Sequence, residues 1–125
     1  MRPKSPTLTP NELEMMRIVW RHERGVTVRD VYEALRVRRA VAYTTVMTAM
    51  KTLEQKGHLK ASQHDRAYLY RAARPKHQVI RAMVREFVDR VFSGSGRPLV
   101  VHLLEDDHLS EADLRDIARM RGKKK

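Results

Sequence analysis

The chain has no cysteine among its 125 residues. This excludes disulfides, thiolate metal sites and thiol nucleophiles, and it suits a reducing cytoplasm, where we expect the protein to act. Long apolar runs are also missing: none approaches the roughly 18 residues that a membrane-spanning helix needs. The opening sequence, Met-Arg-Pro-Lys-Ser-Pro-Thr, has no apolar stretch typical of a signal peptide. We therefore expect no membrane insertion.

Acidic residues are scarce relative to basic ones, 15 against 26, which gives a formal net charge of +11. Such a basic small protein favours polyanions, either nucleic acid or an anionic membrane surface, although a basic protein without such a partner is an alternative. Residues 36–60 contain six basic residues and one acidic residue, whereas residues 98–120 contain two basic and six acidic residues. This asymmetry indicates one end for nucleic acid and another end with a different role.

The signatures of common enzymes are absent as well. The sequence has no glycine-rich phosphate loop and no paired carboxylates in an apolar setting, and Glu105-Asp106-Asp107 is typical of a solvated loop. The six histidines form no pair at helical spacing. A weak metal site between His102 and His108 is an alternative to ordinary histidines. We predict that the protein is not an enzyme and uses no cofactor and no metal.

Residues 42–57 organise the chain, because they read as one helix with two different faces. Val46, Met50 and Leu53 form an apolar stripe at positions i, i+4 and i+7. The other side carries Thr44, Thr45, Met47, Thr48, Lys51 and Thr52. Threonine is a mediocre helix former, but its short side chain suits base edges and phosphates. The pattern predicts a recognition helix; an ordinary amphipathic helix with a polar face is the alternative.

Two helices are expected before this stretch. Thr9-Pro10-Asn11-Glu12 is a capping box that starts a helix with the core-facing stripe Leu13, Met16, Val19 and Trp20. Thr27–Asp30 is a second capping box, for a helix that ends near Arg36. Val26 is expected to form a short strand. A basic turn containing Arg36, Arg38 and Arg39 then leads into the recognition helix, which completes a helix-turn-helix pattern.

An alternating pattern follows Gly57. Residues 58–64 and 67–71 read as two strands, joined by a tight turn at Asp65-Arg66. A hairpin directly after a recognition helix indicates a wing, with Arg66 at its tip and Lys60 or Arg71 flanking it. A solvated hairpin tip without a DNA contact is the alternative.

The second half is expected to be helical and unusually apolar. Pro75 opens a helix, residues 93–98 form a flexible break, Leu99–Leu104 is an apolar run, and a last helix begins at Ser110. These surfaces predict an isologous homodimer, although folding back on the winged domain is an alternative. The predicted dimerisation residues are Ile80, Met83, Phe87, Val91, Phe92, Leu99, Leu103, Leu104, Leu114 and Ile117.

The predicted fold class is mostly α with a small β-hairpin wing. We expect a winged helix-turn-helix DNA-binding domain over residues 1–74 and a helical dimerisation region over residues 75–125. Residues 1–8 and 121–125 are predicted to be basic, mobile ends.

From about residue 8 to 120, the chain resembles penicillinase repressors of the BlaI/MecI type, which are winged-helix transcriptional repressors of bacteria. The order and spacing of several segments carry the resemblance. These segments are Leu8–Trp20, Thr27–Leu35, Ala42–Thr48, Leu53–Gly57, Arg66–Tyr70 and Phe92–Ser95, followed by Leu104, Leu109 and Ser110.

The resemblance implies a homodimer that occupies a palindromic operator and blocks transcription. It assigns base contacts to the recognition helix, and a phosphate contact to Tyr43 is compatible with its place before that helix. The predicted DNA-binding residues are Tyr43, Thr44, Thr45, Met47, Thr48, Lys51, Lys60 and Arg66. A nonspecific basic nucleic-acid-binding protein and a protein-interaction winged-helix module are the alternatives.

The resemblance also implies release by a signal, such as cleavage by a membrane sensor-protease that responds to β-lactams. The corresponding region here is Leu99–Leu104. Some relatives are cut at an Asn-Phe bond, where this chain has His102-Leu103. The resemblance therefore identifies neither the protease cue nor the inducer. A copper-sensing branch carries cysteines near its C-terminus, so the lack of cysteine excludes a thiolate copper switch.

Overall fold

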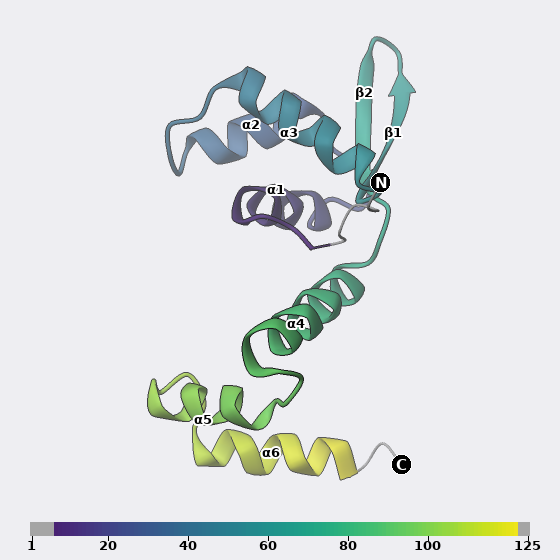
Figure 1. Cartoon of the computed structure of the whole chain (residues 1–125). Coiled ribbons are helices and arrows are strands. Elements are labelled where there is room, and N and C mark those ends of the chain that lie inside the picture. Colours follow the sequence, from purple (N-terminus) through teal and green to yellow (C-terminus); the bar gives the residue numbers. More distant parts are fainter. Residues whose placement is uncertain (1–6, 123–125) are drawn as a thin grey trace. The chain divides into compact units, whose positions relative to one another are not determined.

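The computed structural model describes residues 7–122, which form six helices and one antiparallel hairpin (Figure 1). The elements are α1 (Pro10–Trp20), α2 (Val28–Arg36), α3 (Tyr43–Gln55), β1 (Leu59–His64), β2 (Ala67–Ala72), α4 (Lys76–Phe92), α5 (Arg97–Glu105) and α6 (Glu111–Gly122). The predicted fold class, mostly α with a two-stranded wing, is confirmed. The chain divides into two compact units within α4, the first ending at Met83 and the second starting at Val84.

Helices α1, α2 and α6 start where the sequence placed them, because short polar side chains satisfy the first free N–H groups of these three helices. The Thr9 hydroxyl accepts from the Glu12 amide, and the Glu12 carboxylate accepts from the Thr9 amide, at 3.2 and 2.9 Å. Thr27 and Asp30 form the same reciprocal pair at the start of α2. In the second unit, Ser110 and Asp113 do so at the start of α6.

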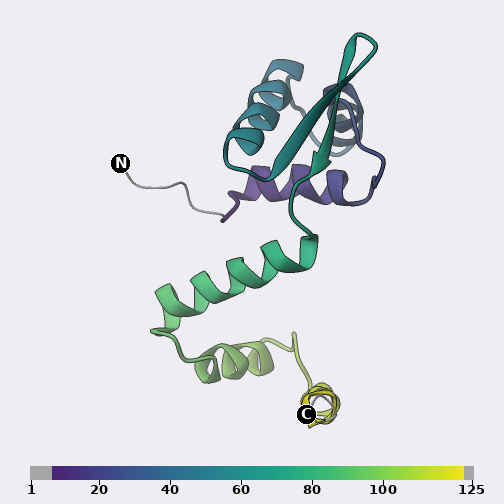
Figure 2. The same ribbon diagram turned by 90° about the vertical axis from the view of Figure 1, so that its right-hand side faces the viewer.

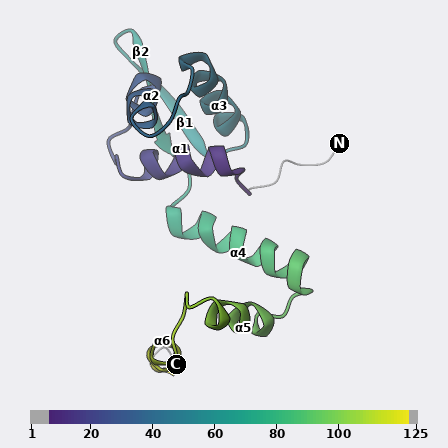
Figure 3. The ribbon, with the colours of Figure 1, turned by 90° about the vertical axis from the view of Figure 1, so that its left-hand side faces the viewer.

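The core of the first unit lies between α1, α2, α3 and the base of the hairpin. Helix α1 packs against α2, α3 and β2, and Figure 3 shows it crossing beneath α2 and α3. Because α1 is covered from several directions, Met15 and Ile18 are buried together with the predicted Met16 and Val19. The narrower stripe predicted for this helix was therefore incomplete.

Trp20 lies at the edge of this core rather than at its centre. It is half-buried, packs against the core cluster, and donates its indole N–H to the Arg74 carbonyl at 3.3 Å. Trp20 thus belongs to the predicted core-facing stripe but covers the edge of the core, where the indole N–H can reach a hydrogen-bond acceptor. Its hydrogen bond joins the end of α1 to the segment that enters α4.

The hairpin pairs Leu59 with Ala72 at its base and His64 with Ala67 next to its turn. Asp65 in the turn has a φ of 56°, in the left-handed region that aspartate tolerates better than most residues. The predicted short strand at Val26 is confirmed as an isolated bridge to Tyr70. Leu59 and Tyr70 bury the base of the hairpin in the core, while its tip projects beyond the helices (Figure 2).

The second unit consists of the end of α4 with α5 and α6. The apolar run at residues 99–104 is helical, within α5. Helix α6 extends through Gly122, so the prediction of a mobile tail was wrong for residues 121 and 122. The prediction of a mobile start was also wrong for Leu8, which is buried in the core. Residues 1–6 and 123–125, the rest of the predicted mobile ends, lie outside the described residues.

Apolar side chains of the second unit remain largely uncovered. The Phe92 ring lies 5.8 Å from the rings of Phe87 and of His102, which links α4 to α5. Among residues 84–121 none is fully buried, and Val91 and Ile117 are each 50% exposed. Within the described part of the chain, no helix has the length and apolar character to cross a membrane.

Candidate nucleic-acid interface

Helix α3 has the two faces that its sequence predicts. Val46, Met50 and Leu53 are completely buried, which pins one side of the helix to the core. On the opposite side, every predicted contact residue is exposed: Tyr43, Thr44, Thr45, Met47, Thr48 and Lys51. The prediction of a helix with one buried and one open face is therefore confirmed. Whether the open face binds DNA is a separate question.

The most prominent positions of that open face form a ridge along α3. Thr44, Thr48, Lys51 and Gln55 follow one another at i, i+4, i+7 and i+11, so they lie in a row opposite the apolar stripe. Gln55 was not named from the sequence, although the same spacing points to it. A row of hydroxyl, ammonium and amide groups can donate to and accept from base edges and phosphates.

One side of the ridge faces a groove between α3 and the hairpin, with a volume of about 530 Å³. This groove, here called the wing groove, brings together four predicted residues from two elements: Tyr43, Met47, Lys51 and Arg66. Its lining also includes Thr27, Val28, Arg29, Ala67, Tyr68 and Tyr70. The lining contains three basic side chains and no acidic one, so it suits an anion.

The other side of the ridge faces a shallower groove of about 470 Å³ beside the start of α1. It is lined by Thr9, Asn11, Glu12, Thr44, Thr45, Thr48, Ala49 and Thr52. The predicted contact residues of α3 are thus divided between two sides of one ridge. Lys60 is exposed on β1 and lines neither groove.

The basic stretch at residues 36–60 is only partly available to a ligand. Arg36 pairs with Glu33 at 3.2 Å, Arg39 with Glu14 at 2.8 Å, and Lys56 with Glu12 at 2.7 Å. Across the described residues, by contrast, Lys51, Lys60 and Arg66 take part in no ion pair. Arg71, the other residue predicted to flank the wing, donates to the Arg24 carbonyl at 3.3 Å. Three of the six basic residues in this stretch therefore have acidic partners; the Lys56 pair is nearly buried, whereas the Arg36 side chain stays 56% exposed.

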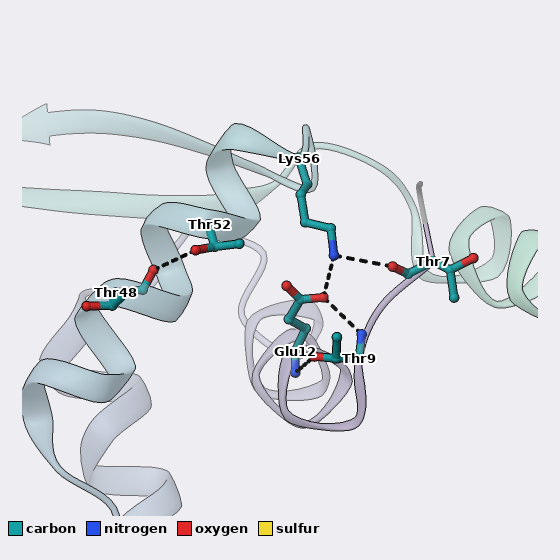
Figure 4. A network of polar contacts seen from close by, with 6 residues as sticks. All are labelled: Thr7, Thr9, Glu12, Thr48, Thr52 and Lys56. Atoms are coloured by element: carbon teal, nitrogen blue, oxygen red, sulfur yellow. Dashed lines mark hydrogen bonds and ion pairs between the residues drawn. The ribbon is translucent and has the colours of Figure 1, made fainter. Parts of the chain in front are cut away.

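The pair formed by Lys56 and Glu12 fixes the end of α3 on the start of α1 (Figure 4). Both side chains are nearly buried, at 14% and 9% exposure, and the Lys56 ammonium also reaches the Thr7 carbonyl. Burial alone would raise the pKa of Glu12, but the contacts with Lys56 and Thr9 outweigh it, so the pKa lies below its usual value of 4.5. Helix α3 is thereby held by an ion pair as well as by its apolar stripe.

Aromatic contacts orient Tyr43 at the start of α3. Its ring meets the ring of Tyr32 edge-on, with centroids 5.4 Å apart and planes at 74°. The Arg29 guanidinium lies 5.8 Å from the Tyr43 ring centre on the side of the wing groove. Tyr43 is the first residue of α3 rather than the residue before the helix, as was predicted, and two residues of α2 hold its ring.

The described residues offer no comparable arrangement of side chains for binding a metal ion. Among the described residues, no group of three or more histidine, aspartate or glutamate side chains is placed to hold a metal ion. His102 lies 3.9 Å from Glu105, an exposed pair on α5.

Comparison with known proteins gives a consistent result. The sequence pattern of the penicillinase repressor family matches residues 8–121. The chain is 35% identical over 103 residues to the transcriptional regulator BlaI of Mycobacterium tuberculosis, covering 82% of this chain and 75% of that protein. It is 25% identical over 114 residues to the penicillinase repressor of Bacillus licheniformis, covering 91% and 88%.

Two solved structures share the fold. The solution structure of the DNA binding domain of the repressor BlaI has a TM-score of 0.53 and 24% identity, covering 60% of this chain and 90% of that one. A Staphylococcus aureus MepR mutant bound to an oligodeoxyribonucleotide also has a TM-score of 0.53, with 18% identity, covering 94% and 80%. At these identities the likeness concerns the winged-helix fold alone.

Proposed function

This chain belongs to the penicillinase repressor family and is a DNA-binding transcriptional regulator rather than an enzyme, and we propose that it acts as a homodimeric repressor on a palindromic operator. The observation that carries the proposal is the open ridge of α3 beside an exposed hairpin. A helix of this width fits the major groove, and the hairpin then meets the neighbouring minor groove.

The proposed contacts are those of the exposed face of α3 and of the hairpin. Thr44, Thr45, Met47, Thr48 and Lys51 read base edges, and Tyr43 binds a phosphate. Lys60 and Arg66 lie on the hairpin, where their charges meet the DNA backbone, and Arg66 at the tip also reaches the minor groove. The exposure of all eight side chains supports these roles.

The homodimer is proposed because the second unit leaves apolar surface open. Phe87 is 39% exposed, and Val91 and Ile117 are 50% exposed. Burial of apolar area is the main stabilising term in folding and association, so these side chains would gain stability from a partner surface. A second copy would cover these side chains in a two-fold interface. Met83 also packs against the core of the first unit, so part of its surface is already used.

Two copies joined in this way present two α3 helices to successive segments of the major groove. For helix-turn-helix dimers, half-sites lie about 34–36 Å apart, or one helical turn. A two-fold dimer therefore requires a palindromic operator.

We also propose that a signal releases the repressor from DNA in the cytoplasm, and that cleavage within residues 99–104 by a sensor-protease is one such signal. His102 is exposed and Leu103 is half-buried on α5. A helix has to open locally before a protease can bind it, and α5 has no fully buried residue that would oppose opening. Cleavage here would divide the proposed dimer interface.

The test is a pair of substitutions on the full chain. A duplex is first selected by the wild type from a randomised pool, and dissociation constants are then measured on that duplex and on random DNA. Thr48→Ala is expected to weaken binding to the selected duplex by about fivefold to tenfold, near the lower end of the cost of a lost base contact, with little change on random DNA. Lys60→Ala is expected to weaken both equally, because it removes a phosphate contact.

Equal losses on both duplexes for Thr48→Ala would count against base readout by α3. Failure of the wild type to select any duplex would leave a nonspecific basic protein or a protein-interaction module.

A further inference from the structure

We propose that one sugar-phosphate strand of the duplex runs along the wing groove, and that Arg29 of α2 binds a phosphate of that strand. The inference rests on the proposed function and adds to it a residue outside the recognition helix and the wing. Arg29 belongs to the first turn of α2 and lines the wing groove together with Lys51 and Arg66.

The path of the strand follows from the geometry of a duplex. With α3 in the major groove and the hairpin at the adjoining minor groove, the strand that separates the two grooves has to pass between α3 and the hairpin. The wing groove occupies that position, since Met47 and Lys51 of α3 face Arg66 and Tyr68 of the hairpin across it.

The chemistry of the lining fits this occupant. Three basic side chains reach the groove, one each from α2, α3 and the hairpin turn, and no acidic residue lines it. Val28, Met47 and the rings of Tyr43 and Tyr68 provide an apolar wall. A deoxyribose-phosphate strand carries a negative charge at each phosphate and an apolar sugar face between phosphates. The basic side chains would therefore meet the phosphates, and the apolar wall would meet the sugars.

Arg29 is held ready for a phosphate. Its Nη1 donates to Glu33 Oε2 at 3.2 Å, and its guanidinium lies 5.8 Å from the Tyr43 ring centre. Its side chain is nevertheless 69% exposed, so the rest of the planar guanidinium is open to a ligand. A guanidinium fixed in this way can form two parallel hydrogen bonds with phosphate oxygens.

Arg36 is a closely matched control on the same helix. It donates to the other oxygen of Glu33, Oε1, at the same 3.2 Å, and its guanidinium lies 5.8 Å from the Tyr32 ring centre. Its side chain is 56% exposed. Arg36 does not line the wing groove. Arg29→Ala and Arg36→Ala therefore remove the same charge and one ion pair each, and differ in access to the groove.

The first test measures binding of the full chain to its selected duplex over a range of salt concentrations. Arg29→Ala is expected to lower affinity at least tenfold at low salt and to reduce the slope of log K against log salt by about 0.9 per bound chain, the value for one lost phosphate contact. Arg36→Ala is expected to change affinity less than threefold and to leave the slope unchanged. Circular dichroism melting verifies that both variants remain folded.

The second test replaces single phosphates of each half-site by uncharged methylphosphonates. One position should weaken the wild type and Arg36→Ala but leave Arg29→Ala unaffected, because that variant has already lost the contact. Equal salt slopes for the two arginine variants, or a methylphosphonate profile for Arg29→Ala that parallels the wild type, would overturn the proposal. If the wild type itself shows salt-independent binding or selects no duplex, the proposed function fails, which is a different outcome.

Discussion

The two units of the chain use apolar residues in opposite ways. All fully buried apolar side chains of the described residues lie between Leu8 and Val79, in the first unit. Leu53 there is completely buried, whereas Ile117 in the second unit is half exposed. The first unit thus satisfies itself, while the second presents apolar surface that only another surface can cover. This difference supports the proposal that the first unit binds DNA and the second unit joins two copies.

The same difference predicts that the two units are stabilised in different ways. Burial of large side chains stabilises the first unit without any partner, so its unfolding should not depend on protein concentration. In the proposed dimer the second unit gains apolar burial on association, so its stability should rise with concentration.

Leu53→Ala should lower the free energy of unfolding by about 3 kcal/mol, within the range of roughly 2–5 kcal/mol for a buried leucine. Leu53 is completely buried on α3, so the substitution leaves a cavity in the closed core. Chemical denaturation followed at two protein concentrations measures the loss and its independence of concentration. Ile117→Ala is the matched change in the second unit, and an equal, concentration-independent loss there would contradict the comparison.

Phe87→Ala should raise the dissociation constant of the homodimer about 100-fold, since each of two copies loses roughly 1.5 kcal/mol of side-chain burial. Phe87 is 39% exposed and contacts Phe92 within its own chain. Sedimentation equilibrium measures the association. Tyr68→Ala removes a 57% exposed aromatic side chain from the hairpin and should leave association unchanged. Equal effects of the two substitutions would remove the basis for placing the interface in the second unit.

Acid should weaken the first unit through Glu12. Its pKa in the folded state is lowered, chiefly because contacts with Lys56 and Thr9 outweigh the effect of burial, so its stabilisation is present above pH 4.5 and is lost as pH falls through the folded pKa. One such group changes the free energy of unfolding by at most about 1.4 kcal/mol per pH unit. Glu12→Gln should flatten that dependence when denaturation is repeated from pH 5 downward.

Glu86→Gln is the control from the second unit, where Glu86 pairs with Arg90 at 3.8 Å with both side chains well exposed. An exposed pair contributes little, so this variant should retain the acid sensitivity of the wild type. A wild-type curve that is flat below pH 4.5 would show that the buried pair does not support the fold.

Thr9→Ala should cost about 1 kcal/mol, the usual effect of losing a helix N-cap. Thr9 caps α1, which packs throughout its length on the first unit. Ser110→Ala removes the equivalent cap from α6, in which residues 111–121 are all at least partly exposed, so it should fray that helix and leave the main melting transition in place. Amide hydrogen exchange resolved by residue distinguishes these two results.

Local signals made much of the fold predictable. The capping residues Thr9, Thr27 and Ser110 act within one helical turn, so their sequence pattern determines their structure. The stripe of Val46, Met50 and Leu53 was an equally reliable signal. A helix that buries a single face repeats its apolar residues with the helical period, and α3 is such a helix. The short run at residues 99–104 carried no such period, so the sequence placed it in a helical region without giving the bounds of its helix.

Contacts between distant segments were not predictable. Lys56 and Glu12 are 44 positions apart, so counting charge along the sequence overestimated the free cations near α3. Arg29 belongs to α2 and comes to the wing groove only when the hairpin folds beside α3. The domain boundary after residue 74 stays a prediction, although Val79 and Met83 of α4 pack with the core of the first unit.

We propose that the first unit binds DNA and that the second unit holds two copies together. The most direct measurement titrates the full chain onto a palindromic duplex, taken from upstream of its own gene, at two salt concentrations, with the stoichiometry determined by sedimentation. The account predicts two chains per palindrome, with affinity that falls steeply as salt rises because phosphate contacts release counterions. Weak binding that grows with duplex length and shows no preference for the palindrome would contradict it.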